Sequence, residues 1–249
     1  MKSPILAALL SASVTAGLGG LGGCDDTPKR EPPERVEAAA LPTAPPSPAP
    51  EARAPDIVVE TSKVTIGTDR IATGESGLAD KVAVFVNGRP LIEGHTVDVV
   101  AMRNAKPSHV AAVVTALRGA KASGVVIKSS SRDNSTQPLP LSFTTNVPAC
   151  TPVAWIAKDA AVDVWPAGGG TAKRIPRGLA GPDVTLGNDA IGALVAKCDA
   201  PVVVVGADEA MTWGLVFDLA MTALHSPTTR GSSAVLVTSA TPGRKLALE

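Results

Sequence analysis

The chain has 249 residues, and its 23 basic residues are balanced by 23 acidic ones. This even balance excludes the basic excess with which nucleic-acid-binding proteins neutralise phosphates. Without an export segment and a tether, about 190 residues remain, which is enough to bury a core that needs no metal or disulfide.

Residues 1–23 have the three parts of a secretory signal peptide. Lys2 provides a positive start, no charged residue occurs from Ser3 to Gly23, and the segment ends in small residues. The sequence Leu21-Gly-Gly-Cys24 resembles the lipobox of bacterial lipoproteins. That resemblance implies that Cys24 is acylated and becomes the first mature residue. A retained transmembrane helix is the alternative, although several glycines weaken the end of such a helix.

Residues 24–55 contain nine prolines among Ala, Glu and Arg. Proline lacks a backbone donor and fixes φ, so neither a helix nor a strand ladder can extend through this segment. We expect a disordered tether between the lipidated Cys24 and the folded part. A proline-rich docking motif is the other interpretation.

Residues 56–147 form the first half of the folded part. β-branched runs predict strands at 57–59, 64–66, 82–86 and 125–127, and Asn87-Gly88 predicts a turn. Residues 107–118 predict a helix, because Pro107 suits a first turn and the apolar residues recur at helical spacing.

Residues 148–249 form the second half, where the pattern is clearer. Residues 153–157 and 161–165 predict a hairpin, and 187–197 predict a helix capped by Asn188. Four consecutive valines at 202–205 predict a strand buried on both faces, from 201 to 205. An amphipathic helix follows at 212–224, and a last strand at 235–237.

These elements predict an α+β fold, with a small mixed sheet and helices packed on one face. The two halves repeat a similar order of strands and helices. We therefore expect two related ββαβ-type halves, which would arise from a degenerate duplication.

The stretch 201–220 carries a family resemblance. It contains a valine-rich strand ending in Ala-Asp208, the pair Trp213-Gly214, and a helix beginning Leu-Val-Phe-Asp218. Over roughly residues 150–238 the chain resembles the periplasmic domain of the ExbD/TolR family of biopolymer transport accessories. The resemblance implies a domain that dimerises, works beside a proton-channel partner and, in TolR-type proteins, contacts peptidoglycan. The family's spanning helix carries an acidic residue, however, and residues 3–23 contain none. The proton-coupling role is therefore not supported.

The resemblance makes Asp208, Trp213 and Asp218 the candidates for contact with a partner. The alternatives are a turn cap for Asp208, a core or dimer-seam side chain for Trp213, and a solvated carboxylate for Asp218. Cys150 and Cys198 are the two cysteines besides Cys24, and in an oxidising compartment we expect them to form a disulfide.

Other residues indicate no chemistry of their own. The three histidines, His95, His109 and His225, lack the spacing of zinc ligands, and no phosphate-binding loop or nucleophile motif occurs. The charged loop with Lys173, Arg174 and Arg177 is either solvated or binds an anionic glycan or peptide. We expect no catalytic residue, cofactor or metal.

The sequence thus predicts a non-enzymatic lipoprotein of the cell envelope, facing the periplasm from a membrane whose identity stays open. Its expected partners are the membrane through the lipid, envelope motor proteins or peptidoglycan, and a second copy of the chain. An exported enzyme, a structural spacer and a transmembrane-anchored transport component are the alternatives.

Overall fold

The computed structural model describes residues 54–248 except 75, 132–134, 199–201 and 227–231. The chain divides into two units, residues 1–49 and 50–249, and every element below belongs to the second. The expected signal peptide, Cys24 and nearly all of the tether lie outside the described residues.

Four helices and eleven strands occur in the described ranges. In chain order they are β1 (Ile57–Val59), β2 (Lys63–Ile66), β3 (Asp69–Ala72), α1 (Leu78–Val86), β4 (Thr96–Ala101), α2 (Pro107–Gly119), β5 (Gly124–Ser130), β6 (Thr136–Leu141), β7 (Pro152–Ile156), β8 (Val162–Pro166), β9 (Lys173–Ile175), α3 (Val184–Val195), β10 (Val202–Ala207), α4 (Trp213–His225) and β11 (Ser233–Val237).

All the strands join one mixed sheet in the order β3-β2-β1-β4-β5-β6-β11-β10-β7-β8-β9. Strands β1, β4 and β5 are parallel, as are β7, β10 and β11, and each set continues into an antiparallel meander at its outer edge. The predicted α+β class with a mixed sheet is confirmed. The expectation of a small sheet is wrong, because the sheet has eleven strands, and four of them, β3, β4, β6 and β9, were not predicted.

The middle of the sheet is its weakest seam. Strand β6 pairs with β5 over six residue pairs, but with β11 only through Ala234 and Leu141. Backbone pairing across this seam is therefore slight, and side-chain packing must hold the two sides together.

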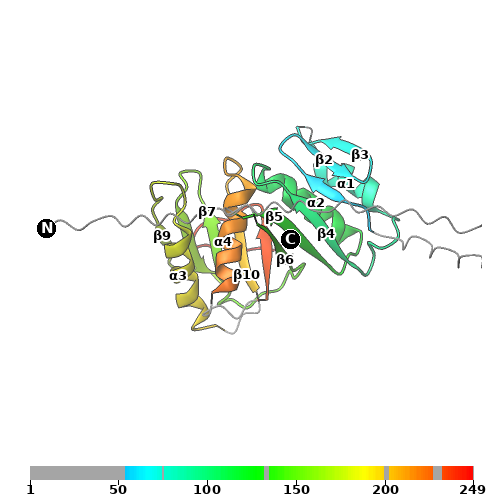
Figure 1. Ribbon diagram of the computed structural model, residues 1–249. Helices are drawn as coiled ribbons and strands as arrows, with labels where there is room; N and C mark the ends of the chain where they lie inside the picture. The colour runs from blue at the N-terminus through cyan, green and yellow to red at the C-terminus, as the bar shows by residue number, and fades with distance from the viewer. Residues whose placement is uncertain (1–53, 75, 132–134, 199–201, 227–231, 249) are drawn as a thin grey trace, which may run out of the picture. The chain divides into compact units, whose positions relative to one another are not determined.

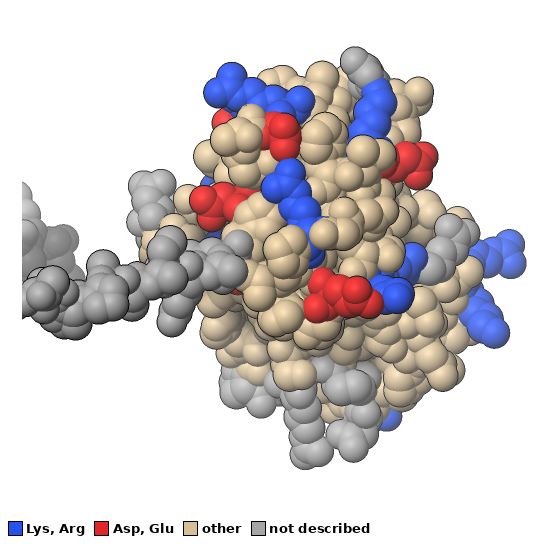
Figure 2. Space-filling view, turned by 90° about the vertical axis from the view of Figure 1, so that its right-hand side faces the viewer, with Lys and Arg blue, Asp and Glu red and all other residues tan. Residues whose placement is uncertain are grey.

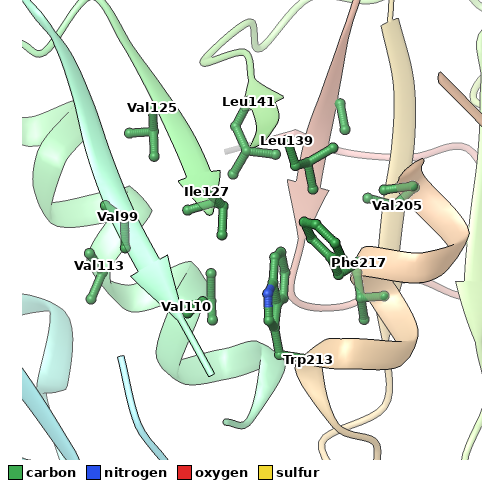
Figure 3. Close-up of a cluster of buried hydrophobic side chains, with 14 of the residues drawn as sticks. Val99, Val110, Val113, Val125, Ile127, Leu139, Leu141, Val205, Trp213 and Phe217 are labelled. Carbon is green, nitrogen blue, oxygen red and sulfur yellow. The ribbon is translucent and has the colours of Figure 1, made fainter. Parts of the chain in front are cut away.

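A single large core cluster spans the seam, and α1, α2, α3 and α4 all contribute to it. Figure 3 shows Trp213 and Phe217 of α4 between Ile127 and Leu139 on one side and Val205 on the other. In Figure 1, α3 and α4 lie beside one another over strands β7 and β10. The aromatic pair of α4 thus fills the interior where β-pairing is sparse.

The second face of the sheet is covered over β7, β10 and β11 but meets solvent at β4. Alternate residues of β7, β10 and β11 form a second cluster, which is covered by residues that include Leu246 and Leu248. The four valines at 202–205 are therefore buried on both faces, as predicted. In β4 the residues alternate between exposed and buried, so its second face meets solvent.

Several predicted elements are confirmed and two details are wrong. The helix at 107–118, the hairpin at 153–165, the helix at 212–224 and the strands at 57–59, 64–66, 125–127 and 235–237 are present. Residues 82–86 are not a strand but the end of α1, because Leu78, Val82 and Val86 recur every four residues and are buried together. The cap of α3 is Asp183, whose carboxylate accepts from the Leu186 N–H at 3.0 Å, and not Asn188.

Candidate functional site

A cavity of about 440 Å³ opens beside the β6–β11 seam. It lies where the strands separate after their single residue pair, and where the C-terminal segment leaves β11. Its lining combines part of α2, the residues that follow β6, and β11 with the segment after it: Ala111, Val114, Thr115, Arg118, Ser142, Phe143, Thr144, and 235–241 with 244–248.

Backbone hydrogen bonds fix the C-terminal wall of this cavity. The Gly170 N–H donates to Gly243 O at 2.9 Å, and the Leu246 N–H donates to Ala167 O at 2.8 Å. The Trp165 indole N–H donates to Arg244 O at 3.0 Å. The triple glycine at 168–170 therefore anchors this segment, and a Cβ at residue 169 would lie 3.0 Å from Lys245 N.

The charged residues of the lining all have one sign. They are Arg118, Arg244 and Lys245, and no Asp or Glu occurs among the described lining residues. Arg244 and Lys245 are exposed, and neither side chain forms an ion pair with the described part of the chain. Hydroxyl groups surround them, from Thr115, Ser142, Thr144, Thr238, Ser239 and Thr241. This combination suits an anion that also accepts hydrogen bonds.

Of the three residues expected to contact a partner, Asp208 supports the turn before α4. Its carboxylate accepts from the Ala210 N–H at 2.9 Å, and its backbone carbonyl accepts from the Met211 N–H at 2.9 Å. The interpretation of Asp208 as a turn cap is confirmed.

Trp213 lies in the core, which confirms the alternative interpretation of this residue as a core side chain. It is fully buried, and its ring centroid lies 6.3 Å from that of Phe217. Its indole N–H has no hydrogen-bond partner among the described residues. Because no part of the side chain reaches the surface, a partner cannot contact Trp213 without a rearrangement of the chain.

Asp218 is not the solvated carboxylate that was expected. It is 9% exposed, and its two oxygens accept from the two terminal nitrogens of Arg103 at 2.9 and 2.7 Å. Arg103 also donates to Ser130 O at 2.7 Å. The hydrogen bond to Asp218 raises the pKa of the Arg103 guanidinium above its ordinary value. Asp218 follows Gly214 by one helical turn and shares its face, where the Arg103 side chain packs.

Trp213 and Asp218 belong to the junction between the strands on either side of the seam, whereas Asp208 follows β10 and its backbone N–H donates to Ile156 O of β7. The backbone N–H of Trp213 donates to Ala105 O at 2.8 Å, and the backbone N–H of Gly214 donates to Arg103 O at 2.8 Å. The start of α4 is thus bound to the loop that follows β4. Arg103 could not be assigned from the sequence, because 115 residues separate it from Asp218.

The predicted disulfide between Cys150 and Cys198 is present, with 5.6 Å between the two Cα atoms. It joins the segment before β7 to the residues after α3. Of the charged residues expected in a loop, Lys173 and Arg174 instead lie in strand β9, and Arg177 follows that strand. Arg174 pairs with Asp159 at 2.6 Å and with Asp163 at 2.8 Å, and its hydrogen bond lowers the pKa of the Asp159 carboxyl.

No group of three or more metal-binding side chains occurs within the described ranges. His109 is 9% exposed and its Nδ1 has no partner in the part of the chain that the structure describes. Burial lowers its pKa, as does the nearby Lys106, while Glu209 acts in the opposite sense. This imidazole is consequently neutral at neutral pH.

The surface is mixed in charge. On the face drawn in Figure 2, Lys and Arg side chains lie among Asp and Glu side chains, without a broad patch of one sign. Among the described helices, none has both the length and the apolar character to cross a bilayer. Within the described residues, Arg244 and Lys245 thus lie at a concave surface without an ion pair.

Comparison with protein-family models, with curated proteins and with solved structures finds no match to this chain.

Proposed function

We propose that the chain is an exported, lipid-anchored binding module of the cell envelope, which faces the periplasm from Cys24. In this proposal residues 1–23 are removed and residues 24–55 are the tether. The folded part is a non-enzymatic module of the ExbD/TolR type that binds an envelope component. The single observation that carries the export is the disulfide between Cys150 and Cys198, because such bonds persist in oxidising compartments.

The order of elements supports the ExbD/TolR-type interpretation and a duplication. One order of elements occurs twice: a strand, a two-strand meander, a helix, a parallel strand, a helix and a further parallel strand. The first set runs from β1 to β5 and the second from β7 to β11, and β6 lies between the two sets in the chain. In both sets the first strand lies between its antiparallel neighbour and its parallel neighbour. We propose that the two halves are related units, with β6 as the strand that connects them.

The chemistry of the cavity supports binding over catalysis. Its described lining provides cations, hydroxyls and apolar side chains, but no carboxylate, imidazole or thiol that could act as a general base or a strong nucleophile. Such a lining can hold and orient an anionic group. The module would then serve as a receptor or scaffold within an envelope assembly.

A retention assay tests this function. The full chain is incubated with purified sacculi and, separately, with detergent-solubilised inner-membrane proteins, and bound protein is quantified after washing. We expect retention on the sacculi or specific capture of an envelope motor protein. Retention on neither, or substrate turnover abolished by a single polar substitution, would contradict the binding-module proposal.

A further inference from the structure

We propose that the cavity beside the β6–β11 seam receives an extended segment of a partner protein, which pairs as an additional strand with the free edge of β11. This inference rests on the proposed binding function and names a polypeptide as what the module binds.

The backbone of β11 carries the first argument. The Ser142 N–H donates to Ala234 O at 2.8 Å, so the backbone groups of Ala234 point toward β6. Because successive residues of a strand direct their N–H and C=O groups to opposite neighbours, Leu236 points the same way, whereas Val235 and Val237 point toward β10. Strand β6 diverges after Ala234, and within the described chain no backbone bond joins Leu236 to β6 or to the residues that follow it.

This unpaired edge lies in the wall of the cavity. Residues 235–238 belong to its lining, so the N–H and C=O of Leu236 are presented to an enclosed space and not to a flat surface. An unpaired N–H and C=O must find a partner, and the free edge of a strand is a template for a further strand. Peptide recognition by strand addition uses such an edge, since the main-chain bonds give affinity and the neighbouring pockets give specificity.

Apolar side chains line both faces of the space beside β11. Leu236 and Val114 of α2 pack against the large core cluster on one face. Leu246 and Leu248 belong to the lining as well, and they cover the second cluster on the other face. The side chains of an inserted segment would alternate between these two surfaces. We therefore expect consecutive apolar residues, as in other strands that are buried on both faces.

The size of the cavity limits the length of the segment. A volume of about 440 Å³ lies in the range of small binding sites and excludes a folded domain. Three residues in a strand span only about 10 Å, so a short extended segment is the form of polypeptide that suits this space. Arg244 and Lys245 form no ion pair within the described chain, and they favour a segment that also carries an acidic side chain.

Amide hydrogen exchange of the purified full chain, followed by NMR at single residues, tests the free edge. The Leu236 N–H should exchange about tenfold or more faster than those of Val235 and Val237, because only the latter two point toward β10. These two neighbours are the internal control, since they share the strand and its surroundings.

Panning of a random heptapeptide library on phage against the full chain tests the occupant. The enriched peptide is synthesised and titrated by calorimetry, and its binding should slow the exchange of the Leu236 N–H. A single N-methyl group, moved along the peptide, should weaken binding at alternate positions, because only alternate residues donate to β11.

Val114→Trp should weaken binding of this peptide about tenfold or more, since the larger side chain occupies the cavity. Val84→Trp is the matched control. It is the same substitution on α1, at a position that is 75% exposed and outside the cavity lining. Its affinity should stay within about twofold of wild type. If Val114→Trp folds poorly, the exchange and N-methyl measurements on wild type decide.

The inference is overturned if the Leu236 N–H of the free protein is as protected as its neighbours, or if the library yields no peptide that binds. It is also overturned if the two Trp variants bind the peptide equally. Because these measurements do not depend on where the protein resides, their failure would leave the lipid-anchored module standing with a different binding surface. Failed retention or failed export would, in turn, leave a free edge at Leu236 intact.

Discussion

At the scale of single residues, Asp218 and Trp213 hold the fold together at its weakest seam. Asp218 has a bidentate partner in Arg103, and Trp213 occupies the core between the two sides of the sheet. Removing one partner of a buried charged pair lowers stability, since the other partner is left without its opposite charge.

Replacement of Asp218 by Ala should lower the free energy of unfolding by roughly 2 kcal/mol, because the Arg103 guanidinium then loses its charged acceptor. Urea denaturation measures the loss. In a double-mutant cycle with Arg103→Ala, we expect a coupling energy of about 1 kcal/mol or more. Strictly additive effects of the two substitutions would show that the pair does not stabilise the junction.

His109 should make stability depend on pH. Its pKa is lowered in the folded state by burial, so the unfolded chain binds the proton more readily. Stability is fully present above the ordinary histidine pKa near 6.5 and is lost as the pH falls from there toward the lower folded value.

Urea titrations between about pH 5 and pH 7.5 measure this dependence. His109→Leu should flatten it, because the buried titrating group is gone. His95→Gln, at an exposed position, is the control and should keep the wild-type slope. The same slope for His109→Leu as for wild type would exclude His109 as its source.

At the scale of elements, the fold followed from the sequence where a segment had its own periodicity. Helix α2 and the valine run of β10 were predictable because helical spacing and continuous apolar runs are local signals. The strand predicted at 82–86 was wrong because a short apolar run fits a strand or a buried helix end equally well. Strands β3, β6 and β9 carry polar or proline residues and take their conformation from neighbouring strands. Strand β4, by contrast, alternates between exposed and buried residues, which is the local signal of a half-buried strand.

The candidate site was not predictable for a related reason. Its lining comes from α2, from the end of β6 and from the residues after β11, which show no periodicity. Arg244 and Lys245 look like ordinary solvated residues in the sequence. Only tertiary bonds to Ala167, Gly170 and Trp165 turn that segment into a wall.

Strand β10 has a position where only glycine fits. A Cβ at Gly206 would lie 2.5 Å from Val237 O and 2.8 Å from the Trp155 ring. Gly206→Ala should therefore destabilise the protein by about 2 kcal/mol, as overpacking does in cores, and thermal denaturation measures the change. Gly124→Ala in β5 is the control, because its Cβ would meet only ordinary contacts from 3.7 Å. Equal melting temperatures for the two variants would contradict this account of β10.

The disulfide closes a loop with a sequence separation of 48 residues. Cys150→Ser with Cys198→Ser should lower the free energy of unfolding by roughly 4 kcal/mol in the chain-entropy model. Non-reducing mass spectrometry of wild type should also detect one crosslinked peptide that contains both residues. Two freely alkylated thiols in the native protein would refute the bond and remove the main support for export.

At the scale of the whole molecule, the proposed function requires an N-terminal anchor and a folded binding module. The repeated order of elements, the disulfide and the cationic cavity are all features of residues 50–249, whereas the anchor depends on Cys24 alone. In the proposed function, a lipid at that position would attach the folded part to a membrane. Two or more acyl chains anchor a protein stably, since each buried CH₂ contributes about 0.8 kcal/mol.

Metabolic labelling with palmitate, which compares wild type with Cys24→Ser in the cells that produce the protein, tests this central claim most directly. The account predicts label in the wild type alone, together with a mature chain that begins at residue 24. Equal labelling of the two proteins, or a chain that retains Met1, would contradict the lipid anchor and favour a membrane-spanning stalk.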